Sequence, residues 1–192
     1  MRIRRTAALA AALALSLPLV IGITATSAQA AEPFGTGCAA LPTGSAAGSA
    51  ESMAKEKVAD AAASNPELST LVTAVTQAKL GDTLNNAQDI TVFAPTDAAF
   101  AKVPADDLQA LLADDAALKQ VLTYHVVPQT LTPDNISGSH KTLEGSELTV
   151  EGSGTDWTVN GTAKVVCGNV ETANATVYLL SLIHISEPTR RS

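Results

Sequence analysis

The stretch Thr91–Phe100, TVFAPTDAAF, carries the strongest structural signal in this chain. Its first three residues favour a β-strand, because branched and aromatic side chains pack well on a pleated surface. Pro95 excludes the preceding residue from helical geometry and fixes its own backbone angle, which ends the strand in a sharp turn. Thr96 is a good helix N-cap, and Asp97 places negative charge in the first helical turn. The stretch therefore predicts a buried strand, a turn and the start of a helix.

The two phenylalanines of this stretch, Phe93 and Phe100, are predicted to lie in the core. Asp97 is expected to accept a hydrogen bond from a backbone amide at the turn. A second motif, Thr123–Val127 or TYHVV, follows two leucine-rich segments that are expected to be helical. Its aromatic and β-branched composition predicts a strand.

These two motifs, in this order and at this spacing, resemble the fasciclin domain, and the resemblance extends from Val58 to Leu180. It is greatest to the small secreted single-domain fasciclin proteins of actinobacteria, among them a mycobacterial immunogenic antigen. The resemblance implies an α+β fold, a wedge-like twisted β-sheet with helices packed around it. It also implies an extracellular protein concerned with adhesion and binding and not with catalysis.

The apolar pattern of the chain favours the same fold class. Leu68, Leu71, Val72 and Val75 recur at helical spacing and predict an amphipathic helix over Pro66–Lys79. Near the end of the chain the pattern changes to strand-like alternation broken by glycines, which predicts hairpins. Helices first and strands later are typical of an α+β domain. The sequence contains a single copy of that domain.

Residues 1–30 are predicted to be a signal peptide. Arginines precede the apolar stretch Ala7–Ile23, and Ala28-Gln29-Ala30 gives a small-x-small cleavage pattern. A membrane anchor that is never removed is the alternative, but the apolar stretch is short and Pro18 interrupts it. The expected localisation is therefore secreted or associated with the cell envelope, with no stable membrane insertion after cleavage.

The rest of the chain divides into an arm, one domain and a tail. Residues 31–54 are rich in Ala, Gly and Ser and predict a flexible N-terminal arm. Residues 55–180 are assigned to the fasciclin domain. Residues 181–192 depart from the family pattern and resemble translated sequencing-adapter sequence, so no functional role is assigned to them. A divergent native tail is the alternative.

The charge of the chain restricts its partners. It has 12 Lys and Arg against 19 Asp and Glu, a formal net charge of −7. An acidic surface argues against nucleic acid and anionic membranes as partners, although solubility alone is the simpler explanation of the charge. The resemblance implies an extracellular or envelope protein, glycan or lipid as the ligand.

The sequence contains two cysteines, Cys38 and Cys167, which suit an exported chain. An even number of cysteines in such a chain predicts a disulfide, which would tie the N-terminal arm to a late strand. The mycobacterial relatives look similar at both positions. Two separate buried thiols are the alternative.

Tyr124 and His125 are the candidate partner contacts, because in some animal fasciclin proteins the segment around this motif contacts adhesion receptors. On the predicted strand their side chains point to opposite faces, so one of them is expected to be buried. A buried, hydrogen-bonded structural histidine is the alternative. The residues of the first motif are assigned structural roles, namely Phe93, Pro95, Thr96, Asp97 and Phe100.

Catalysis finds little support in the sequence, and no catalytic, cofactor-binding or metal-binding residue is assigned. The predicted domain contains His125 and His140, the latter in a polar run that is expected to be exposed. There is no G-x-S-x-G elbow, no metal-ligand spacing and no glycine-rich phosphate loop. Two alternatives to a binding module stay open. One is an envelope-directed hydrolase that uses His125 or His140, and the other is a carrier of a small apolar ligand, which requires an enclosed pocket.

Overall fold

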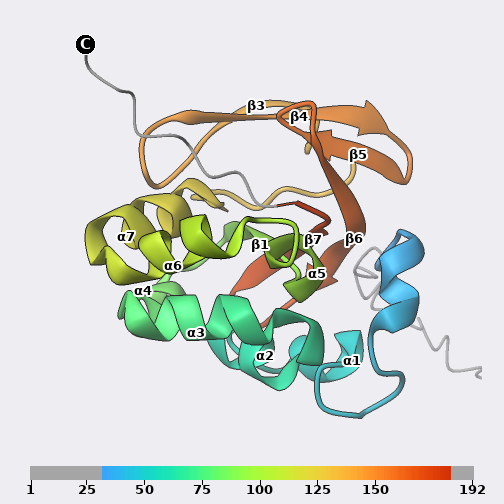
Figure 1. Cartoon of the computed structure of the whole chain (residues 1–192). Helices are drawn as coiled ribbons and strands as arrows, with labels where there is room; N and C mark the ends of the chain where they lie inside the picture. Colours follow the sequence, from blue (N-terminus) through green and yellow to red (C-terminus); the bar gives the residue numbers. More distant parts are fainter. Residues whose placement is uncertain (1–31, 183–192) are drawn as a thin grey trace, which may run out of the picture.

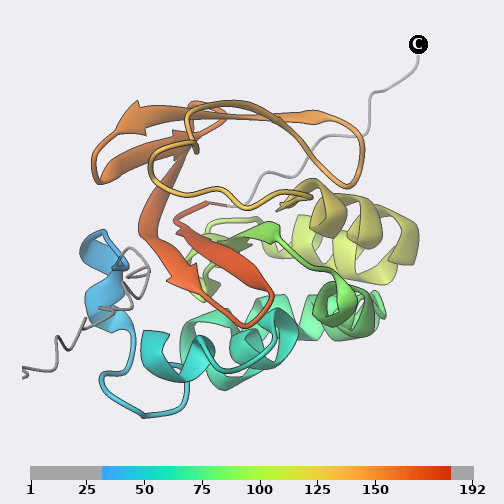
Figure 2. The same cartoon turned by 180° about the vertical axis from the view of Figure 1, so that it is seen from behind.

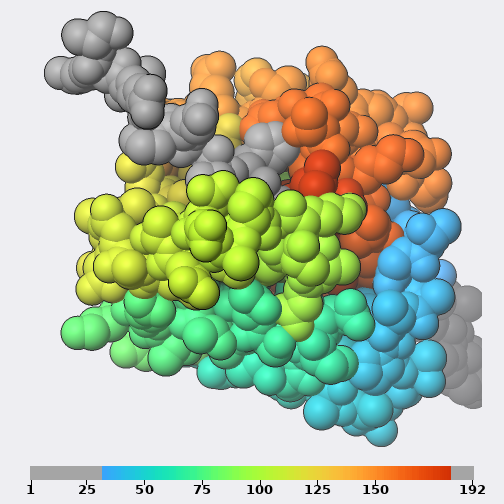
Figure 3. All heavy atoms as spheres, viewed as in Figure 1, coloured from blue at the N-terminus to red at the C-terminus, as the bar shows by residue number. Residues whose placement is uncertain are grey.

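The computed structural model describes residues 32–182. The predicted signal peptide and residues 183–192 of the predicted tail lie outside the described residues. Seen from opposite sides, helices cover one face of the central strands and a layer of β-hairpins covers the other (Figures 1 and 2). In the space-filling view the helices pack into a continuous layer beneath the hairpins (Figure 3). The predicted α+β class is confirmed.

Short helices make up the first part of the described chain and follow apolar stripes of helical spacing. Leu68 and Leu71 are the buried members of one stripe, and Leu118 and Val121 belong to another. The 3-10 helices are η1 (Thr36–Ala40) and η2 (Pro66–Leu68). The α-helices are α1 (Ala50–Met53), α2 (Val58–Ser64), α3 (Ser69–Gln77), α4 (Gly81–Asn86), α5 (Asp97–Phe100), α6 (Ala105–Ala113) and α7 (Asp115–Tyr124).

The strands form a seven-stranded sheet in the order β2-β1-β7-β6-β5-β4-β3. They are β1 (Ile90–Pro95), β2 (Val126–Val127), β3 (Gly138–Lys141), β4 (Glu147–Ser153), β5 (Asp156–Val159), β6 (Ala163–Glu171) and β7 (Ala175–Leu180). β1 and β7 pair in parallel, and all other neighbours are antiparallel.

β6 joins the two halves of this sheet. Its first residues, Ala163 and Lys164, pair with β5, whereas Val165–Glu171 pair with β7. Register shifts on both sides of Cys167 interrupt the pairing with β7. Irregularities of this kind bend a strand and increase its twist. β6 accordingly runs from the hairpin layer into the central strands (Figure 1).

The two central strands, β1 and β7, are buried on both faces and separate two cores. On β1, Val92 and Ala94 belong to the core on the helix side, and Phe93 belongs to the core on the hairpin side. On β7, Val177 and Tyr178 divide in the same way, and the Tyr178 ring stacks on Phe93 with 5.6 Å between centroids. Two-sided burial explains why β1 is apolar apart from Thr91, whose buried hydroxyl donates to the Gln129 carbonyl at 2.8 Å.

The motif Thr91–Phe100 folds as a strand, a cap and a helix. Pro95 is the last residue of β1, and the Thr96 side chain caps α5 by accepting a hydrogen bond from the Ala99 amide at 3.3 Å. The Thr96 amide donates to the Leu180 carbonyl at 3.2 Å, which anchors the cap to β7. Phe93 and Phe100 are both buried. The motif therefore fixes where the central strand ends and where the helical layer begins.

The predicted strand over Thr123–Val127 is wrong in its first half. α7 continues through Tyr124, His125 ends it, and only Val126 and Val127 form β2. The side chain of Asp114 caps the start of this helix, and the buried stripe of Leu118, Val121 and Leu122 is followed by the buried His125. Tyr124 and His125 are therefore neighbours at a helix end, and the argument that a strand turns them to opposite faces does not apply.

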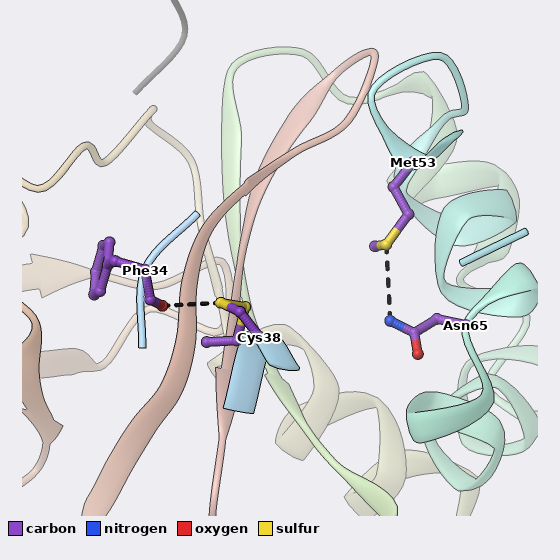
Figure 4. Close-up of a disulfide and its surroundings, with 5 residues drawn as sticks. Phe34, Cys38, Met53 and Asn65 are labelled. Carbon is purple, nitrogen blue, oxygen red and sulfur yellow. Dashed lines mark hydrogen bonds between the residues drawn. A yellow bond between two sulfur atoms is a disulfide. The ribbon is translucent and has the colours of Figure 1, made fainter. Parts of the chain in front are cut away.

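The N-terminal arm lies along β6. Phe34 and Gly168 exchange backbone hydrogen bonds of 3.0 and 2.8 Å, and Cys38 forms a disulfide with Cys167, with 4.8 Å between their Cα atoms. Figure 4 shows the Cys38 sulfur facing the Phe34 carbonyl oxygen, 3.0 Å away. A Cβ at Gly35 would lie 2.4 Å from the backbone oxygen of Val166, so glycine here permits the close approach of arm and strand.

The arm also joins the helix-side core at its other end. Met53 of α1 is 1% exposed, and its sulfur lies 3.7 Å from the side-chain nitrogen of Asn65 (Figure 4). Ser49 caps α1 by accepting from the Ser52 amide at 3.1 Å. The polar, glycine-rich composition of residues 31–54 thus includes a helix cap and close backbone contacts, which composition alone does not reveal.

Candidate functional site

Asp97 joins two helices. Its carboxylate accepts a hydrogen bond from the Thr70 amide at 2.8 Å and from the Ser69 hydroxyl at 2.5 Å. Both donors lie in the first turn of α3, whose own N-cap position, Leu68, has no capping side chain. Asp97 therefore caps α3 from outside that helix. Partial burial raises the pKa of Asp97, but the hydrogen bonds from Ser69 and Thr70 together outweigh it and lower the pKa below its usual value.

Asp97→Asn is expected to lower the free energy of unfolding by about 1–2 kcal/mol at neutral pH, because a charged cap is replaced by a weaker acceptor. The pKa of Asp97 is lowered in the folded state, so its stabilisation is complete above the unfolded pKa and is lost as pH falls through the folded pKa. Urea unfolding of both proteins at pH 7 and pH 3 measures this. A difference between the two proteins that is equally large at both pH values would contradict the assignment.

His140 is buried, with 8% of its surface exposed, and the prediction that it is exposed is wrong. It lies on β3 opposite Leu148, so strand alternation turns it toward the hairpin-side core. Its Nε2 donates to the Ile136 carbonyl at 2.7 Å, and its Nδ1 faces the side-chain nitrogen of Gln129 at 3.5 Å. Both ring nitrogens are therefore engaged in holding the loop before β3.

His125 is also buried, at 4% exposure. Its Nδ1 lies 2.7 Å from the carbonyl oxygen of Val121, one helical turn earlier, so the ring satisfies a carbonyl at the end of α7. The edge of one ring meets the face of the other between Tyr124 and His125, with centroids 5.8 Å apart. His125 also lines a cavity on the helix side of the sheet.

Tyr124 is half-buried and connects α7 to the hairpin layer. Its hydroxyl accepts a hydrogen bond from the side-chain nitrogen of Asn160 at 2.7 Å and donates to the Glu147 carbonyl at 3.3 Å. The side-chain oxygen of Asn160 in turn accepts from the Thr149 amide at 2.9 Å. This network fixes the position of the Tyr124 ring while part of it stays accessible.

Asn174 is a structural residue to which the sequence analysis assigned no role, because its hydrogen-bond partners lie far away in the sequence. The residue is 7% exposed. Its side chain accepts from the Val58 amide at 2.9 Å and donates to the carbonyls of Leu84 at 2.8 Å and Ala87 at 2.7 Å. One amide thus joins the start of α2 to the end of α4.

An apolar cavity of about 270 Å³ lies between α2, α3, α4 and α7 and the strand β1. We call it the helix-side cavity. Its wall is largely aliphatic and includes Leu68, Leu71, Val72, Val75, Leu84 and Leu122. No sequence pattern indicated it, since a cavity depends on how the faces of separate elements meet. Within residues 32–182 there is no group of three or more His, Cys, Asp or Glu residues that could hold a metal ion.

The family model of the fasciclin domain matches residues 66–183. This chain belongs to the fasciclin domain family. The match covers all of the sheet and the helices from η2 onward, so the central strands, both cores and most of the wall of the helix-side cavity are parts of a fasciclin domain.

Relatives of similar length support the assignment. Immunogenic protein MPB70 of Mycobacterium bovis is 42% identical over 192 residues, which cover 95% of this chain and 97% of that protein. Cell surface glycolipoprotein MPB83 of Mycobacterium bovis is 45% identical over 163 residues, which cover 80% of this chain and 72% of that protein. The resemblance to mycobacterial immunogenic antigens is therefore confirmed.

A solved structure shows the same fold. The FAS1 domain pair of the insect cell adhesion molecule Fasciclin I matches with a TM-score of 0.62 over 70% of this chain, at 20% sequence identity. The match covers 52% of that chain, so this fasciclin domain spans about half of the pair. At such low identity the likeness concerns the fold alone.

Proposed function

We propose that this protein is an exported, non-catalytic binding domain that attaches to a protein, glycan or lipid at or outside the cell envelope. Its family and the relative named as a cell surface glycolipoprotein support this location. None of the helices within residues 32–182 is long and apolar enough to cross a membrane. Binding takes place on the outer surface of a scaffold that the disulfide and the two cores hold together.

The burial and hydrogen bonding of the two imidazoles are the main support for a non-catalytic function. A hydrolase needs a histidine that can accept a proton from a nucleophile at hydrogen-bond distance. His125 and His140 are both buried, and each places a ring nitrogen 2.7 Å from a backbone carbonyl oxygen. Such contacts use the imidazoles to complete the backbone hydrogen bonding of a helix end and a loop, which favours a structural role.

The contact surface that we propose includes the half-buried ring of Tyr124. Its hydroxyl network holds the ring in one position, and a pre-ordered aromatic side chain loses little entropy when a partner binds. His125 lies behind it with 4% exposure, so its contribution to a partner on the surface is to support Tyr124. The net charge of −7 favours neutral or basic partner surfaces over nucleic acid.

Fluorescently labelled, oxidised protein mixed with envelope fragments of the source organism tests this proposal. We expect saturable binding that unlabelled protein displaces, and Tyr124→Ala should weaken it more than Tyr124→Phe does. A labelled, unrelated acidic protein of similar size serves as the control. Turnover of an ester or glycoside substrate that disappears in His125→Gln or His140→Gln, with an unchanged circular dichroism spectrum, would overturn the proposal.

A further inference from the structure

The helix-side cavity differs from the rest of the interior because apolar side chains surround a space that they do not fill. Protein cores are close-packed and hold few voids larger than a water molecule. The cavity occupies about 270 Å³, and the aliphatic residues of α2 and α3 form much of its wall. We propose that it binds one aliphatic chain with an uncharged, hydroxyl-bearing head group. This inference goes beyond the proposed function, which concerns the outer surface.

The volume sets the size of the ligand. An engineered apolar cavity of about 150 Å³ holds benzene, so on the same scale 270 Å³ accommodates roughly eleven carbon atoms. Pockets for drug-sized ligands begin near 300 Å³. A single chain of about ten carbons fits this space, whereas a polycyclic lipid or a two-chain phospholipid does not. The aliphatic wall matches such a chain along its length.

The charges around the cavity set the head group. Asp60 of α2 and Asp82 of α4 line it and are exposed, and none of the described residues that line it is Lys or Arg. A fatty-acid carboxylate would face two like charges without a cation to pair with. A hydroxyl head group can instead donate a hydrogen bond to either carboxylate, and bonds to a charged acceptor are the stronger kind. The charge pattern therefore selects a neutral amphiphile over a fatty acid.

Leu143 provides an independent indication of an apolar ligand. It is the one large apolar side chain within residues 32–182 that is strongly exposed, at 43%, and it lines this same cavity. It lies in the β3–β4 loop, where its amide donates to the Val126 carbonyl at 2.8 Å. The next residue, Glu144, accepts a hydrogen bond of 3.0 Å from the Gln120 side chain of α7. The loop thus holds an apolar side chain where a bound chain would cover it.

Binding of 1-decanol and of decanoate to the oxidised full chain at pH 7 tests the inference. Isothermal titration calorimetry gives the affinities, and methyl NMR spectra identify the residues affected. We expect 1-decanol to bind at micromolar concentrations, at least tenfold more tightly than decanoate, and to shift the methyl signals of Val72, Val75 and Leu143. Comparable affinity for both ligands, or no binding in saturated 1-decanol, would overturn the inference.

A matched pair of variants distinguishes binding in the cavity from binding elsewhere on the protein. Val72→Phe places a larger side chain in the cavity and should weaken 1-decanol binding at least tenfold, whereas Val103→Phe, at a half-buried position outside the cavity, should leave the affinity within twofold. Circular dichroism checks that each variant folds, and Val75→Phe replaces Val72→Phe if the latter does not. Unchanged 1-decanol binding in a folded cavity variant would place the ligand elsewhere and refute the site. If the protein failed to bind envelope fragments, the proposed function would fail, but the results for 1-decanol binding in the cavity would still stand.

Discussion

Cys38→Ala combined with Cys167→Ala is expected to lower the free energy of unfolding by about 4 kcal/mol. The disulfide closes a loop with a sequence separation of 129 residues, and loop-closure entropy alone corresponds to roughly 4–5 kcal/mol for a loop of that length. The bond also holds the arm on β6, where Phe34 pairs with Gly168. Without it, the backbone pairing and the packing of η1 must retain the arm by themselves.

Thermal and urea unfolding measure this effect, and a reductant supplies the control. Reduction should lower the melting temperature of the unmodified protein toward that of the double variant, and it should leave the double variant unchanged. The argument would fail if the unmodified protein melted at the same temperature with and without reductant. Proteolysis within residues 32–54 should become faster when the bond is absent, because the arm then opens more often.

Asn174→Ala has the second large effect, an expected loss of about 3–4 kcal/mol. The substitution leaves the Val58 amide and the Leu84 carbonyl without the partner that Asn174 provides, and it removes one of the bonds to the Ala87 carbonyl. Each unsatisfied buried group costs about 1–3 kcal/mol. The N-cap residue of α2, Lys57, makes no capping bond, and the Asn85 side chain, which accepts from the Ala59 amide at 2.9 Å, is the cap that remains, so partial fraying of α2 and α4 is expected to accompany the loss. Urea unfolding followed by circular dichroism measures it.

Asn135→Ala is the matched control for Asn174→Ala. Asn135 also makes hydrogen bonds with both atoms of its amide, to the Thr132 amide and to the Thr130 carbonyl, but it is exposed. Water can replace an exposed side chain, so this variant should lose less than about 1 kcal/mol. Equal losses in the two variants would show that burial of the Asn174 amide is not what stabilises the junction of α2 and α4.

Predictions from the sequence succeeded where the structural signal is local. The strand, turn and helix of Thr91–Phe100 follow from the fixed angle of Pro95 and the capping preference of Thr96, which act within a few residues. The predicted end of α7 was wrong because the composition around Tyr124 and His125 suits a strand. The helix whose buried residues are Leu118, Val121 and Leu122 instead continues through Tyr124. Tertiary packing overrides weak local preferences of this kind.

The candidate site was predicted less well than the fold. Asp97 was expected to bond an amide at its own turn, but it caps α3, which lies 27 residues earlier in the chain. His140 was expected to be exposed, and the register of β3 with β4 turns it inward. The helix-side cavity had no signal in the sequence. The contacts of Asp97 and His140, and the walls of the cavity, involve residues on other elements, so the positions of those elements decide them.

The sequence by itself determined the fold class and where the central strand meets its helix, because backbone preferences and apolar periodicity are properties of neighbouring residues. Two motifs in it, Thr91–Phe100 and Thr123–Val127, indicated the family by their resemblance to the fasciclin domain. The tertiary structure alone decided which polar groups are paired and where space remains inside. Asn174 and Asp97 bond donors on helices far away in the sequence, and the helix-side cavity exists because α2, α3, α4 and α7 meet β1 without filling the space between them. Packing between distant segments sets such contacts, and no local pattern encodes it.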